Sequence, residues 1–137
     1  MPHLVLEYSA NLPPRLDPQR LVDRLHAAAL ETGAFEVGAL RTRAAARACY
    51  RIADGHPDNA FVAAVLRVGH GRDADTRRRI GEAIFAAMCE ELTPLLETLP
   101  LGVSFEVQEI DPNVSFTKNT LHDFVDRRQR RETEPHE

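Results

Sequence analysis

The 137-residue chain contains no tryptophan, one lysine (Lys118) and two cysteines. Cys49 and Cys89 are far apart and outside any C-x-x-C spacing, and no segment resembles a signal peptide, so a reducing cytoplasm is the expected location. No apolar run approaches the roughly 18 residues that a membrane-spanning helix requires. The six histidines are scattered, without the spacing that is typical of metal ligands.

The chain also has fewer basic residues than acidic ones, 17 against 21. The formal net charge is -4, which argues against a nucleic-acid-binding protein that works by neutralising phosphates. The 43% hydrophobic and 28% charged fractions are ordinary for a globular protein, and the length fits one domain near the size where assembly adds useful stability. We expect this domain to span residues 1–125. Residues 126–137 carry charges of both signs and almost nothing to bury, so we expect them to form a disordered tail.

The hydrophobic pattern predicts an α+β domain with the order β-α-β-β-α-β. Apolar or alternating segments predict strands at residues 3–8, 37–43, 60–66 and 101–109. Apolar residues at helical spacing predict one helix that begins at Asp17-Pro18 and ends at Gly33, and a second helix that begins at about Asp75. Crossover helices of this length make each strand pair parallel, giving a mixed four-stranded sheet with both helices on one face. The other face needs cover, and we infer that other subunits supply it.

Pro2 precedes the first strand directly. If Met1 is removed, as is usual when the next residue is small, Pro2 becomes a free secondary amine held on a rigid ring. An α-amino group titrates near pH 8, and burial or nearby cations lower its pKa, so a neutral amine could act as a general base. The alternative is that Pro2 has no catalytic role, since most Met-Pro beginnings have none.

Arginines supply almost all of the positive charge. Arg41 and Arg43 occupy alternate positions of one predicted strand, so their side chains should leave the sheet on the same face, and Arg72 lies in the turn after the third strand. A base beside several guanidinium groups suits a substrate with multiple carboxylates whose reaction builds negative charge. The alternative, that these arginines form weak surface ion pairs, stays open on spacing alone.

Several segments together resemble the 5-carboxymethyl-2-hydroxymuconate isomerase family of the tautomerase superfamily, over roughly residues 2–124. They are the start MPHLVLEYSAN, GALRTR at 38–43, ADG at 53–55, AFV at 60–62, GHGR at 69–72 and Gly81-Glu82. The resemblance implies a homotrimer with active sites near subunit interfaces. It also implies a cofactor-independent and metal-independent isomerase that acts on a dienol tricarboxylate in homoprotocatechuate degradation.

Carried over residue by residue, the resemblance makes Pro2 the acid/base and Arg41 and Arg72 the substrate-binding arginines, with Arg43 as an accessory. Two alternatives remain. One is another proline-dependent keto-enol tautomerase with a phenylpyruvate-like substrate, which the three arginines disfavour. The other is a ferredoxin-like binding module for RNA or regulation, which is disfavoured by 6% aromatic content and by Phe61 being the only aromatic residue of its strand.

Overall fold

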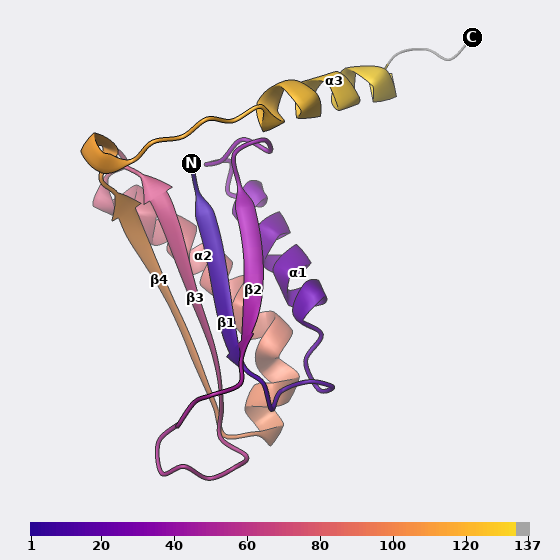
Figure 1. Cartoon of the computed structure of the whole chain (residues 1–137), viewed down its shortest axis with the longest axis vertical. Helices are drawn as coiled ribbons and strands as arrows, with labels where there is room; N and C mark the ends of the chain where they lie inside the picture. The colour runs from indigo at the N-terminus through magenta and orange to yellow at the C-terminus, as the bar shows by residue number, and fades with distance from the viewer. Residues whose placement is uncertain (134–137) are drawn as a thin grey trace.

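The computed structural model describes residues 1–133, and the elements follow the predicted β-α-β-β-α-β order with a further C-terminal helix. The four strands are β1 (His3–Ser9), β2 (Arg41–Arg47), β3 (Ala60–Gly69) and β4 (Leu101–Ile110). The helices are α1 (Pro18–Glu31), α2 (Ala74–Thr98), the 3-10 turn η1 (Pro112–Val114) and α3 (Leu121–Thr133). Figure 1 shows α1 and α2 together behind one face of the sheet.

Both long helices begin where a carboxylate satisfies a free backbone donor. The Asp17 side chain accepts a hydrogen bond from Arg20 N at 3.1 Å, and the Asp73 side chain accepts one from Thr76 N at 2.7 Å. α1 ends just before Gly33, whose φ of +74° favours glycine. The helix predicted after Asp17-Pro18 is therefore confirmed at both ends.

The sheet has the strand order β2-β1-β3-β4. β1 and β2 are parallel, β3 and β4 are parallel, and the central pair β1 and β3 is antiparallel, so the prediction of a mixed four-stranded sheet is confirmed. The predicted boundaries of the second strand, 37–43, are wrong. Residues 37–39 form a turn and β2 runs through the alanine-rich segment to Arg47, because pairing with β1 overrides the weak strand preference of alanine.

Within residues 1–133, helices cover one face of the sheet and leave the other open. Leu4, Leu6, Val62 and Leu66 lie on the helix side and are fully buried against the apolar stripes of α1 and α2. The register puts the alternate residues on the opposite, open face, among them the apolar side chains of Val5, Phe61, Ala63 and Val65. The open face thus carries apolar side chains for which no helix of residues 1–133 provides cover (Figure 1).

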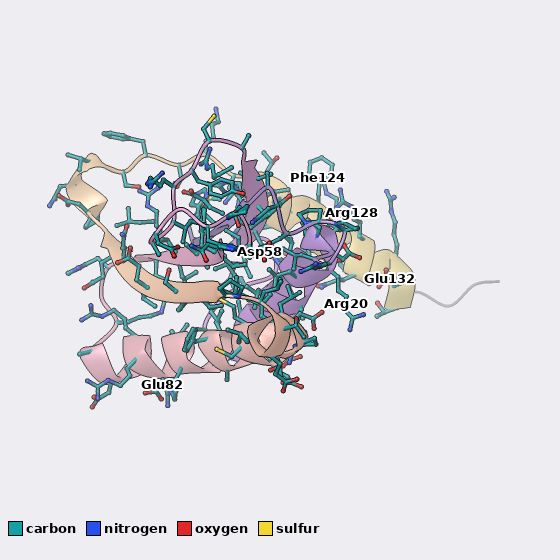
Figure 2. All side chains as sticks on the ribbon, turned by 90° about the horizontal axis from the view of Figure 1, so that it is seen from below. Arg20, Asp58, Glu82, Phe124, Arg128 and Glu132 are labelled. Carbon is teal, nitrogen blue, oxygen red and sulfur yellow. The ribbon has the colours of Figure 1, made fainter. Side chains whose placement is uncertain are left out.

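The C-terminal segment differs from the expected tail. Residues 126–133, part of the segment predicted to be a disordered tail, form the last turns of α3, and residues 134–137 lie outside the described part of the chain. Guanidinium groups support the helix locally, because the Arg127 and Arg128 side chains lie 5.0 and 6.0 Å from the Phe124 ring centroid. In Figure 2, Phe124 and Arg128 are on α3, which extends away from the sheet and its two covering helices.

Candidate active site

Three parts of the chain that carry the predicted site residues meet at one end of the sheet. β1 begins there with Pro2 directly before it, and β2 begins there with Arg41, which is the partner of His3 in the parallel register. β3 runs antiparallel to β1, so its last residues and the turn that holds Arg72 reach the same end. We call this the site end of the sheet; Figure 1 shows it at the top, beside the label N.

Pro2 is buried, and its carbonyl oxygen accepts a hydrogen bond from Arg41 N at 3.3 Å. This bond continues the β1–β2 ladder one residue beyond the first strand residue and fixes the backbone of Pro2 against β2. Met1 precedes Pro2 in the structure, so the proline nitrogen is part of an amide here. A free amine at this position requires removal of Met1.

The register places Arg41 and Arg43 on the open face, opposite His3 and Val5 respectively. The prediction that both side chains leave the same face is therefore confirmed. Arg41 Nη1 donates to the carbonyl oxygen of Ala39 at 3.1 Å, and Arg43 Nη1 lies 3.1 Å from His3 Nδ1. Arg41 is half-buried, whereas Arg43 is exposed and lies one step further from the site end.

Arg72 is held beyond the C-terminal end of α1. Its Nη2 donates to the carbonyl oxygen of Ala34 at 2.9 Å, and its guanidinium carbon lies 5.2 Å from the centroid of the Phe35 ring. The contacts of Arg72 are thus with this corner and with Gly69, whose carbonyl oxygen lies 3.5 Å from Nη1. The structure brings Arg72 to the same end of the sheet as Pro2 and Arg41, on a different segment of chain.

The three predicted site arginines have no acidic partner in the part of the chain that the structure describes. Within residues 1–133, no carboxylate oxygen lies within 4 Å of a side-chain nitrogen of Arg41, Arg43 or Arg72. Four other arginines of residues 1–133 are paired with carboxylates, as in the 2.6 Å contact of Arg20 Nε with Glu91 Oε1 between α1 and α2, whereas Arg67 and several more have no such partner there. Guanidinium groups that keep free donors are suited to bind an external carboxylate.

The sequence did not single out two further residues of this region, His3 and Arg67. Arg67 on β3 is the antiparallel partner of His3, so a row of Arg41, His3 and Arg67 crosses the open face. Burial, followed by the charges of Arg43, Arg41 and Arg67, lowers the pKa of His3 from its ordinary value of 6.5. Only the pairing of β1 with both β2 and β3 reveals this row, and that pairing could not be read from spacing.

Among residues 1–133, no three His, Cys, Asp or Glu side chains gather closely enough to bind a metal ion. None of the helices in that same part of the chain is long and apolar enough to cross a membrane.

Comparison with solved structures first identifies the fold. A fused 4-OT symmetric trimer matches with a TM-score of 0.65 at 15% identity, covering 85% of this chain and 92% of that one. At this identity the likeness concerns the fold alone. Together with the two β-α-β units, it shows that this chain shares its fold with that protein.

More similar proteins narrow the class. The family model of 5-carboxymethyl-2-hydroxymuconate isomerase matches residues 2–125. The 5-carboxymethyl-2-hydroxymuconate Delta-isomerase of Escherichia coli is 31% identical over 122 residues, which are 89% of this chain and 97% of that protein. A crystal structure of a 5-carboxymethyl-2-hydroxymuconate isomerase from Deinococcus radiodurans R1 matches with a TM-score of 0.84 and 32% identity, covering 90% of this chain and 93% of that one.

The chain therefore belongs to the 5-carboxymethyl-2-hydroxymuconate isomerase family, as the resemblance in its sequence predicted. It is an isomerase. The roles of Pro2, Arg41, Arg43 and Arg72 stay predictions.

Proposed function

We propose that the protein converts 5-carboxymethyl-2-hydroxymuconate into its 2-oxo-3-ene isomer, as a step in homoprotocatechuate degradation. The observation that carries the proposal is the convergence of the Pro2 segment with Arg41 and Arg72 at one end of the sheet, where these arginines have no acidic partner within residues 1–133. A substrate with three carboxylates would complement these charges. The two free cysteines fit the cytoplasmic location expected from the sequence.

In the proposed mechanism, the amine of Pro2 takes the proton of the 2-hydroxyl group and returns a proton to carbon 5. The C2–O bond becomes a carbonyl and the conjugated double bonds shift, so the product differs from the substrate only in the position of one hydrogen. Arg41 and Arg72 hold carboxylates and stabilise the developing dienolate, with Arg43 as an accessory. The reaction moves only a proton, so it needs neither a cofactor nor a metal.

The working unit in this proposal is a homotrimer. Two features support assembly with further copies: the apolar side chains on the open face, and the C-terminal segment, on which Phe116 is 90% exposed and Phe124 is also exposed. Burial of these apolar side chains against another subunit would stabilise the assembly. Sedimentation analysis of the purified protein should give the mass of three chains, and a stable monomer would contradict this part of the proposal.

The first test concerns Pro2. Intact-mass spectrometry should find Met1 removed from the active protein. Pro2→Ala keeps an amine but loses the rigid ring, and we expect kcat to fall by about 10²-fold or more while the fold is retained. Gly102→Ala is a matched control, because a Cβ at Gly102 meets no atom within 4 Å. Retention of Met1 in active enzyme, or full activity of Pro2→Ala, would refute catalysis by proline.

The second test concerns the arginines and the substrate class. Arg41→Ala and Arg72→Ala should each lose about 2–4 kcal/mol of transition-state stabilisation, measured as kcat/KM. Arg72→Lys keeps the positive charge but lacks the planar guanidinium group that contacts Ala34 and Phe35. Its activity therefore distinguishes the effect of the charge from that of these contacts. Faster turnover of a monocarboxylate enol than of the tricarboxylate would instead identify a phenylpyruvate-like tautomerase.

A further inference from the structure

His3 and Arg43 are joined across β1 and β2 by a contact whose polarity can be assigned. The distance from Arg43 Nη1 to His3 Nδ1 is 3.1 Å. A guanidinium group has only donors, so His3 Nδ1 must be the acceptor in this contact. The imidazole is therefore neutral in this arrangement, with its proton on Nε2.

The surroundings of His3 favour that neutral form. The charged groups that face it are Arg41 and Arg43 from β2, Arg67 from β3, and the amino terminus of its own strand. Within residues 1–133, no carboxylate oxygen lies within 4 Å of its ring nitrogens. Partial burial, followed by these cations, lowers the pKa of His3, so the ring stays an acceptor at neutral pH.

The Arg43 side chain has less support from the protein backbone than those of Arg41 and Arg72. Arg41 and Arg72 are each anchored by a backbone carbonyl oxygen and are half-buried, whereas Arg43 is exposed and has His3 as its hydrogen-bond partner. An unanchored arginine side chain loses much of its rotamer freedom when it binds a ligand. One bond from Nη1 to His3 restricts the guanidinium beforehand and leaves its remaining donors free.

We propose that neutral His3 is a positioning residue for Arg43, holding its guanidinium at the site end of the open face so that it binds one carboxylate of the substrate. The inference rests on the proposed function and adds to it a residue that acts through Arg43. Protonation of His3 removes the acceptor and adds a cation beside the guanidinium. Acidification therefore weakens the binding of that carboxylate by Arg43 and raises KM, whereas protonation of the Pro2 amine would lower kcat.

Kinetics of the full-length protein with 5-carboxymethyl-2-hydroxymuconate between about pH 5 and pH 8 test this. His3→Phe removes the acceptor and keeps a flat ring, and we expect KM to rise about tenfold at neutral pH with kcat nearly unchanged, as for loss of one charged hydrogen bond. His3→Asn offers an amide oxygen as acceptor and does not titrate. It should restore KM at neutral pH and abolish the rise in KM that the wild-type enzyme shows on acidification. His56→Asn, on the loop at the opposite end of the sheet, is the matched control and should keep the wild-type profile.

A wild-type KM in His3→Phe, failure of His3→Asn to restore KM, or an acidic limb unchanged in His3→Asn would each overturn the inference. A second measurement does not depend on activity. Nitrogen-15 NMR of the histidine rings should find His3 with its proton on Nε2, and Arg43→Ala should raise the pKa of His3. A proton on Nδ1 would refute the positioning role in an active enzyme, whereas failure to turn over the substrate at all would refute the proposed function alone.

Discussion

Gly38 is the point where the C-terminal helix meets the body of the domain, and Gly38→Ala is predicted to detach it. A Cβ at this position would lie 2.6 Å from His122 Nδ1, 2.8 Å from His122 Cα and 3.0 Å from His122 N. Two of these atoms belong to the backbone and cannot swing aside. Gly38 is also buried, so the new methyl group has no outward path.

The required displacement can be estimated from these distances. An ordinary Cβ contact begins at 3.4 Å, so the His122 Cα must retreat by at least ~0.6 Å. The bond from Asn119 Nδ2 to the Gly38 carbonyl oxygen is 3.0 Å long, and the same shift would stretch it to about 3.6 Å, beyond hydrogen-bonding range. Loss of that bond and of the nearby packing should cost the docked segment about 1–2 kcal/mol.

Hydrogen exchange measures this local free energy. We expect the amides of residues 121–133 to exchange about tenfold faster in Gly38→Ala, while those of the buried strands β1 and β3 keep their protection. Gly102→Ala is the control, because its Cβ has open space and Gly102 lies at the opposite end of the sheet. Equal exchange rates in Gly38→Ala and wild type would refute the close packing of α3 against Gly38.

Two further predictions concern stability. Ser9 is fully buried, and its Oγ accepts a hydrogen bond from Phe61 N at 3.0 Å. Ser9→Ala leaves that donor unpaired, so chemical denaturation should show that the free energy of unfolding falls by about 1–3 kcal/mol. A wild-type denaturation midpoint would mean that the Phe61 donor finds another partner. The pKa of His3 is lower in the folded protein than its ordinary 6.5, so the unfolded chain binds the proton more tightly. Its contribution to the free energy of unfolding is therefore intact above about pH 6.5 and decreases as the pH falls below that value. In His3→Asn, the free energy of unfolding should fall less on acidification than in the wild type. Identical dependence of stability on pH in the two proteins would contradict a lowered pKa of His3.

The sequence by itself determined the kinds and order of the elements as far as β4, but not the C-terminal helix α3. Asp17-Pro18 and Gly33 bound the first helix because capping and left-handed backbone are local properties of a few residues. The first strand is equally local, since the short apolar run Leu4-Val5-Leu6 suffices to predict it. The family was also predictable, because several short segments in a fixed order carry the resemblance.

Tertiary structure decided the features that depend on pairing. β2 begins at Arg41 and includes alanines with weak strand preference, because its partner β1 fixes the register. The final residues predicted to be disordered continue α3, whose start is held by contacts of Asn119 and His122 with a loop more than 80 residues earlier. The row of Arg41, His3 and Arg67 exists only because β1 pairs with a parallel strand on one side and an antiparallel strand on the other. Local sequence sets which residues point to a face, but long-range pairing sets which of them become neighbours.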